Sequence, residues 1–123
     1  MTVPAIRGVY EVVVRVRDLE RAEAFYRDVL GLELGLADPR RPMSFWRVAG
    51  CDGMLVLQQD DGEWPTQHFA FRVDETDLED AKKRLEQHGV TVNGPIHHEW
   101  MPAKSLYFAD PDGHELELCA PLG

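Results

Sequence analysis

The two halves of this sequence repeat the same order of predicted elements. A short alternating apolar stretch, a helical pattern and three further short apolar stretches occur in that order in each half of the chain. When His68 is aligned with Glu11, Val73 falls on Val16, and both helical patterns end at a glycine. Each half of the sequence therefore predicts one βαβββ module.

Periodicity and turn residues predict where the elements begin and end. Asp18 is a typical helix N-cap, and Gly31 and Gly89 are typical residues at which a helix ends. Short runs rich in β-branched and aromatic residues, bounded by turn residues, predict strands. The expected helices span 18–31 and 76–88, and the expected strands span 9–16, 32–36, 44–48, 54–58, 67–73, 90–92, 105–109 and 115–119.

The length of the chain favours one compact domain. At 123 residues and 44% hydrophobic content, the chain can close one core but not two independent ones. We predict an α+β fold of residues 1–123 in which two modules, about 8–60 and about 65–121, form a cupped, mixed β-sheet with flanking helices. The concave side of such a sheet is the expected place for a ligand.

The charge balance excludes some partners. With 22 acidic and 13 basic side chains the formal charge is -9, which would repel a nucleic-acid backbone and an anionic membrane surface. No run approaches the roughly 18 apolar residues of a membrane helix, and the N-terminus has no signal-peptide core. A cytoplasmic location is expected, in which Cys51 and Cys119 would be small, buried, reduced thiols.

Three polar residues interrupt strands that otherwise read as apolar. Glu11 lies among valines, His68 opens the equivalent strand of the second repeat, and Glu117 lies between two leucines. A buried carboxylate without a partner is unfavourable by several kcal/mol, so these strands predict a neutralising partner. The alternatives are an ion pair of Glu11 with Arg15, a backbone-bonded core histidine, and an exposed edge position for Glu117.

The repeat would bring these three side chains to one cavity floor. One imidazole and two carboxylates suit a divalent cation of intermediate hardness, such as Mn²⁺, Fe²⁺, Zn²⁺ or Ni²⁺. Three protein ligands would leave coordination positions open for a substrate. We therefore predict a metal site formed by Glu11, His68 and Glu117.

Four further residues are candidates for contact with a substrate. Trp46 and Arg47 alternate along a predicted strand, so at most one of them faces the cavity. Trp100 and Lys104 fall in a stretch, 94–104, that contains two prolines and is expected to be a loop overhanging the site as a lid. The alternatives are core or rim packing for the tryptophans and a solvated side chain for Lys104.

Segments that span nearly the whole chain carry a resemblance to a known family. They are Glu11-x-Val13-x-x-Val16-x-Asp18-Leu19, Phe25-Tyr26-x-x-x-Leu30-Gly31-Leu32, His68-Phe69-Ala70-Phe71-x-Val73, and the stretch from Ser105 to Leu118. In these segments the chain resembles the vicinal oxygen chelate proteins, which include glyoxalase I, fosfomycin-resistance proteins, extradiol dioxygenases and bleomycin-resistance proteins. The resemblance implies metal ligands at Glu11, His68 and Glu117, and assembly as a homodimer.

Three positions depart from the patterns of particular branches. The first ligand of most enzymatic members is His or Gln, whereas this chain has Glu11, which adds negative charge to the site. Glyoxalase I members use a fourth ligand, for which the candidates here are Val56, which cannot ligate, and Gln58, which requires a register shift of two. Fosfomycin thiol transferases have a threonine where this chain has Val13.

The leading hypothesis is a metal-dependent enzyme that acts on a small molecule chelating through neighbouring oxygens. The metal would stabilise a developing enolate or oxyanion, and isomerase, lyase and dioxygenase chemistry all fit. Glu11 could leave the metal and act as the catalytic base. The alternatives are a fosfomycin-type thiol transferase and a metal-free protein that binds a drug or metabolite.

Overall fold

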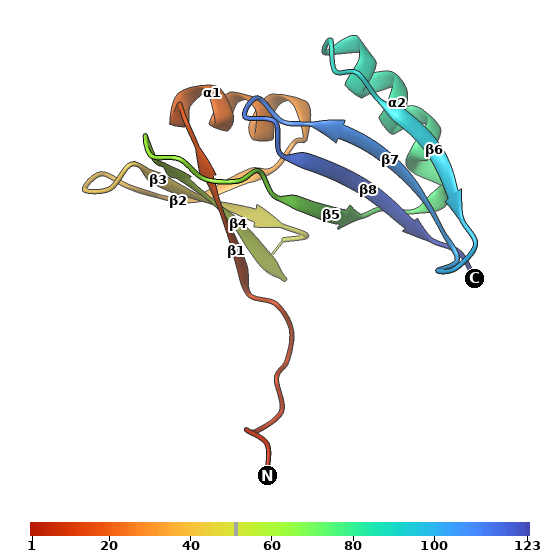
Figure 1. Ribbon diagram of the computed structural model, residues 1–123, viewed down its shortest axis with the longest axis horizontal. Coiled ribbons are helices and arrows are strands. Elements are labelled where there is room, and N and C mark those ends of the chain that lie inside the picture. Colours follow the sequence, from red (N-terminus) through yellow and green to blue (C-terminus); the bar gives the residue numbers. More distant parts are fainter. Residues whose placement is uncertain (51) are drawn as a thin grey trace. The chain divides into compact units, whose positions relative to one another are not determined.

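The protein folds into two compact units, each built around one four-stranded sheet (Figure 1). The structure is a computed structural model that describes residues 1–50 and 52–123, so the expectation for Cys51 lies outside the described residues. Unit 1 is Met1–Gly62 and unit 2 is Glu63–Gly123. Each contains strand, helix and three strands, which confirms the α+β class and the two βαβββ modules.

Unit 1 has a mixed sheet in the order β1-β4-β3-β2. β1 and β4 are parallel, and the other neighbours are antiparallel. The helical segment between β1 and β2 begins as an α-helix and ends as a π-helical turn, labelled η1. The elements are β1 (Glu11–Val16), α1 (Leu19–Ala24), η1 (Phe25–Val29), β2 (Glu33–Asp38), β3 (Met43–Val48) and β4 (Gly53–Gln59).

The start of α1 and the core of unit 1 follow from the sequence pattern. The side chain of Asp18 accepts a hydrogen bond from the backbone N of Arg21 at 3.2 Å, as an N-cap should. Val14 and Val16 are fully buried on one face of β1, whereas Glu11 on the other face is exposed. One face of this sheet is therefore packed, and the other is available to a ligand.

Unit 2 repeats this arrangement with the strand order β5-β8-β7-β6 and a parallel pair, β5 and β8. Leu78 of the helix packs with Leu106 and Ala120 of the sheet in a buried cluster. The elements are β5 (His68–Arg72), the 3-10 turn η2 (Glu75–Asp77), α2 (Leu78–Gln87), β6 (Asn93–His98), β7 (Ala103–Ala109) and β8 (Glu115–Pro121).

Two sequence expectations in unit 2 are wrong. The strand expected at 90–92 starts only at Asn93, and the stretch 94–104 is no lid, because β6 and β7 form a hairpin that leaves only residues 99–102 as a turn. Prolines suggested a loop, but Pro95 lies in β6, the edge strand of this sheet, beside an irregularity in the register. An edge strand tolerates a residue that lacks an N–H.

Two smaller points concern the thiols and the helices. Cys119 is a free thiol that is only partly buried, so the expectation of a fully buried side chain is wrong. In the described part of the chain, no helix has the length and apolar character that crossing a membrane requires.

Candidate metal centre

His68 and Glu117 lie next to each other on one face of the sheet in unit 2. The parallel register of β5 and β8 sets Ala70 opposite Glu117 and His68 opposite Glu115, so the three polar side chains share a face. Nε2 of His68 lies 3.2 Å from Oε1 of Glu117. Two of the three predicted metal ligands are therefore in contact.

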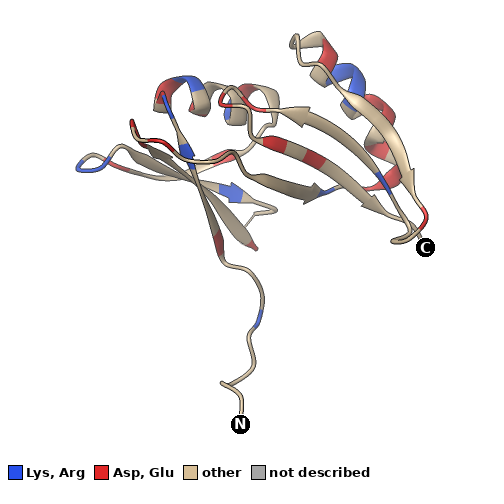
Figure 2. Ribbon diagram, in the orientation of Figure 1, with Lys and Arg blue, Asp and Glu red and all other residues tan. Residues whose placement is uncertain are grey.

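His68 and Glu117 each contact one further polar side chain through their other polar atom. Ser105 on β7 donates its hydroxyl to Oε2 of Glu117 at 2.5 Å, and the carboxylate is nearly buried. Nδ1 of His68 lies 2.8 Å from Oε1 of Glu115. Acidic residues of β8 are visible in Figure 2. Oε2 of Glu117 and Nδ1 of His68 are thus occupied. Oε1 of Glu117 and Nε2 of His68 face each other.

A tyrosine and a second histidine extend the polar face. The ring of Tyr107 stacks on His68 with centroids 6.3 Å apart, and its hydroxyl lies 2.7 Å from Nε2 of His98. Burial is the largest cause that raises the pKa of the Tyr107 phenol, and the negative charge of Glu117 is the second. The hydrogen bond between Tyr107 and Ser105 lowers this pKa. The phenol therefore keeps its proton at neutral pH and can donate a hydrogen bond.

Ser105 and Tyr107 were not among the sequence candidates for the site. They alternate with Leu106 and Phe108, both buried, so Ser105 and Tyr107 share one face of β7. Tyr107 is directly opposite Glu117 in the antiparallel register of β7 and β8. The alternation was readable from the sequence, but the register that joins it to Glu117 was not.

Glu11 is the first residue of β1 in unit 1, and its side chain is exposed. The expectation that this carboxylate is buried among valines is wrong, because only the opposite face of β1 is packed. Glu11 instead lines an open cavity of unit 1. Its convergence with His68 and Glu117, which belong to unit 2, stays a prediction.

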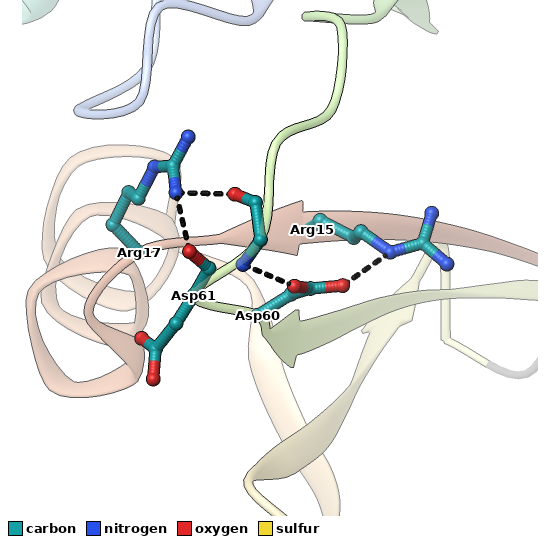
Figure 3. A network of polar contacts seen from close by, with 5 residues as sticks. Arg15, Arg17, Asp60 and Asp61 are labelled. Atoms are coloured by element: carbon teal, nitrogen blue, oxygen red, sulfur yellow. Dashed lines mark hydrogen bonds and ion pairs between the residues drawn. The ribbon is translucent and has the colours of Figure 1, made fainter.

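The alternative partner of Glu11, Arg15, is engaged elsewhere. Nε of Arg15 donates to Oδ2 of Asp60 at 2.8 Å, and Oδ1 of the same carboxylate accepts from the backbone N of Gly62 at 2.7 Å (Figure 3). Arg17 donates from Nη1 to the carbonyl oxygens of Asp61 and Gly62. This network ties the end of β1 to the segment that follows β4.

Trp46 and Arg47 lie on opposite faces of β3, as the alternation predicts. Trp46 is 2% exposed, and its Nε1 donates to Oγ of Ser44 at 2.8 Å, which makes it a core residue of unit 1. Arg47 lines the same cavity as Glu11. Of the two, Arg47 is therefore the one available to a ligand.

Trp100 and Lys104 do not lie together over the polar face. Trp100 is 80% exposed in the turn between β6 and β7. Lys104 forms an ion pair with Glu75 at 2.8 Å. In the alternation of β7 it shares the face of Leu106, which packs against α2, and that face is opposite to the one that carries Tyr107.

The register of β4 identifies the residue equivalent to Glu117 in the first repeat. Val56 is opposite Val13 in the parallel pair, just as Glu117 is opposite Ala70. Gln58 is opposite Arg15, so the register of β1 and β4 is not shifted by the two residues that would bring Gln58 to the position of Val56. The side chain at this position in unit 1, Val56, therefore has no oxygen or nitrogen atom that could bind a metal.

A comparison with known protein families agrees with this architecture. The sequence pattern of the Glyoxalase/Bleomycin resistance protein/Dioxygenase superfamily matches residues 8–118. The chain belongs to this superfamily. The glyoxalase superfamily match includes both modules and all three predicted ligand positions.

Several relatives of this glyoxalase superfamily protein have names that describe thiol transfer. The chain is 34% identical to the glutathione transferase FosA of Serratia marcescens, over 92% of this chain and 80% of that protein. It is 26% identical to the metallothiol transferase FosB of Staphylococcus haemolyticus, over 92% of this chain and 83% of that protein. A crystal structure of an integron cassette protein, HFX_CASS4, from the mobile metagenome of the Halifax Harbour sewage outfall has a TM-score of 0.90 at 50% identity and covers 94% of this chain and 99% of that one.

The donor set of this superfamily member fits a divalent metal. An imidazole nitrogen and a carboxylate oxygen are presented side by side, and this combination suits cations of intermediate hardness. Within residues 1–50 and 52–123 no group of three or more His, Cys, Asp or Glu side chains forms a complete metal site. His68 and Glu117 would supply two ligands, and Glu11 is the predicted third.

Proposed function

We propose that this protein is a divalent-metal-dependent transferase that adds a thiol to a small epoxide of the fosfomycin kind. The observation that carries the proposal is the paired His68 and Glu117 in a chain whose relatives include the thiol transferases FosA and FosB. This function was the alternative to isomerase, lyase or dioxygenase chemistry in the sequence-based hypotheses, and the relatives favour it.

The proposed reaction opens the epoxide ring. The thiolate sulfur forms a bond to one epoxide carbon, the bond from that carbon to oxygen breaks, and the oxygen takes up the proton that the thiol has lost. A bound metal ion would act as a Lewis acid and stabilise the negative charge that develops on this oxygen. His68, Glu117 and Glu11 would hold the ion, and Tyr107 would offer a hydrogen bond on the same sheet face as His68.

Two features argue against a glyoxalase I activity. Val56, at the position equivalent to Glu117, has no donor atom for a fourth ligand. A second carboxylate ligand, Glu11, would also reduce the Lewis acidity of the metal relative to a site with a neutral first ligand.

We further propose a homodimer, as the superfamily resemblance implies. The apolar side chains Val12, Val13 and Leu34, which are more than 40% exposed in the single chain, support this proposal. Sedimentation equilibrium of the purified protein would test it. A mass equal to one chain at micromolar concentration would contradict it.

The activity itself can be tested with purified protein, Mn²⁺, fosfomycin and either glutathione or cysteine. Mass spectrometry should find a product whose mass is the sum of the epoxide and the thiol, and its formation should require both the metal and Glu117. The variant Glu117→Gln tests the requirement for Glu117, because it removes the negative charge and keeps the size of the side chain. A protein that binds Mn²⁺ but forms no adduct with any thiol would contradict the proposal.

The role of Glu11 needs a separate variant. If Glu11 is a metal ligand, Glu11→Gln should lower both the bound metal and the rate of adduct formation. If it is only a base, metal content should stay unchanged while the rate falls. Unchanged metal content together with an unchanged rate would exclude both roles.

A further inference from the structure

A cavity of about 430 Å³ in unit 1 combines charged groups with apolar walls. Arg47 and Glu11 are its charged lining residues, and Leu36, Phe45 and Met54 contribute apolar side chains. The volume lies within the range of sites for small organic ligands, about 300 to 1,000 Å³, and exceeds the space that a three-carbon epoxide fills. The cavity therefore has room for a larger molecule with an apolar body.

Arg47 is the cationic group of this cavity and is available to a ligand. Among the described residues, no hydrogen bond or ion pair engages its guanidinium, although Glu33 is its neighbour in the register of β2 and β3. The protein has a formal charge of -9, so an arginine without an acidic partner is notable. An unpaired guanidinium in a cavity is suited to bidentate binding of a carboxylate, phosphate or phosphonate.

A glycine on the neighbouring strand makes space for the Arg47 side chain. A Cβ at Gly35 would lie 3.3 Å from Cγ of Arg47 and 3.5 Å from its Nε. The stem of Arg47 therefore lies along the backbone of β2, where a larger residue would displace it. The absence of a side chain at this position keeps the guanidinium over the sheet, in the wall of the cavity.

Glu11 and Arg47 stand in one row across the sheet. Met54 of β4 is opposite Glu11 of β1 in one direction and opposite Arg47 of β3 in the other. Two strand spacings separate the charged residues, which is roughly 10 Å between their Cα atoms. The cavity therefore has an acidic end and a cationic end with Met54 between them.

We infer that this cavity binds an amphipathic anion, with the anionic head on Arg47 and the apolar body against Phe45, Leu36 and Met54. The inference deepens the proposed function and rests on it for the reaction, because the far end of the ligand would lie beside Glu11, the predicted metal ligand. Binding of the anion depends only on the residues of the cavity and does not require the proposed reaction. The ligand class is an organic phosphonate, phosphate or carboxylate with an apolar body, and a substrate of the proposed reaction would be an epoxide of this class with a larger apolar body than fosfomycin has.

The test compares two probes by isothermal titration calorimetry, phenylphosphonate and inorganic phosphate, with the full chain. Phenylphosphonate should bind roughly 10-fold or more tightly than phosphate, because its ring is removed from water. Arg47→Gln should weaken phenylphosphonate binding roughly 10- to 100-fold, and Arg47→Lys should weaken it less because it keeps the charge. Arg84→Gln, which removes an exposed arginine paired with Asp80 on α2, is the matched control and should change nothing.

Amide chemical shifts keep the test independent of folding and turnover. Phenylphosphonate should shift the amide resonances of Gly35 and Met54 in the wild-type protein, and these shifts should be absent in Arg47→Gln while the rest of the spectrum is retained. Equal affinity of wild type and Arg47→Gln, or equal binding of the two probes, would overturn the inference. A protein that binds phenylphosphonate through Arg47 but forms no thiol adduct would overturn the proposed function and leave the anion site standing.

Discussion

His68 presents Nε2 to Oε1 of Glu117 at 3.2 Å, although the two residues come from the first and last strands of unit 2. The parallel pairing of β5 and β8 makes this contact, since it sets these strands side by side. Ser105 and Glu115 hold the other polar atoms of the pair. If the proposed cation binds here, these two side chains would need little rearrangement, which would lower the cost of ordering the ligands.

Glu117→Gln should lower the affinity for Mn²⁺ by roughly 100-fold or more, because the amide that replaces the carboxylate carries no charge. Electron paramagnetic resonance of free Mn²⁺ during a titration measures this directly. Glu86→Gln, which neutralises an exposed acid on α2, is the control and should leave the affinity unchanged. Equal Mn²⁺ binding by wild type and Glu117→Gln would remove Glu117 from the ligand set.

Glu115→Ala should lower the affinity for Mn²⁺ by about 10- to 100-fold although Glu115 is not a predicted ligand. Its carboxylate engages Nδ1 of His68 and so leaves Nε2 for the metal. The ¹⁵N shifts of the His68 ring should change in this variant, and Glu115→Gln, which keeps an acceptor oxygen, should recover part of the affinity. An unchanged affinity of Glu115→Ala for Mn²⁺ would show that the contact between Glu115 and His68 is a surface ion pair without a role in metal binding.

The Tyr107 phenol should titrate above pH 10, the approximate value for tyrosine in a peptide. Its pKa is raised in the folded protein, so between the two pKa values the unfolded chain binds fewer protons than the folded one. The contribution to stability is complete below about pH 10 and is lost as the pH rises through the folded pKa. The difference in alkaline ultraviolet absorbance between wild type and Tyr107→Phe gives the midpoint, and a value below 10 would contradict the prediction.

Trp46→Ala should destabilise the protein by about 3 to 5 kcal/mol, because the buried ring leaves a cavity and Ser44 loses its partner. Trp46→Phe should cost less, since most of the volume is retained. Urea denaturation followed by circular dichroism measures both changes. Trp100→Ala is a suitable comparison and should change stability by less than about 0.5 kcal/mol, because Trp100 is 80% exposed. A loss in Trp46→Ala no larger than that of Trp100→Ala would contradict the assignment of Trp46 to the core.

His114 should be a structural residue. It is fully buried, its Nδ1 accepts a hydrogen bond from the backbone N of Gln67 at 2.8 Å, and its ring stacks on Trp64. His114→Phe keeps an aromatic ring but leaves the Gln67 N–H without this acceptor, so it should cost about 1 to 3 kcal/mol in urea denaturation. The Mn²⁺ affinity of the folded variant should equal that of wild type, and a large loss of affinity would give His114 a place in the metal centre.

The two modules and the residue types of the candidate site were predictable from local patterns in the chain. Strand and helix periodicities are local, and they repeat, so the βαβββ order and the equivalence of Glu11 with His68 could be inferred without coordinates. The N-cap at Asp18 also follows from local chemistry. These features depend on residues near each other in the chain, and the sequence contains that information directly.

Which side chains meet depends on how the strands pair in the folded protein. Contact of His68 with Glu117 and of Ser105 with Glu117 depends on strand register, and a shift of one residue would turn each side chain to the other face. Alternation along β7 puts Lys104 and Tyr107 on opposite faces, and the register with β8 decides that Tyr107 is the one beside Glu117. Register is set by packing between strands that are distant in the sequence, so local patterns predict the candidate ligands but not which atoms of other strands contact them.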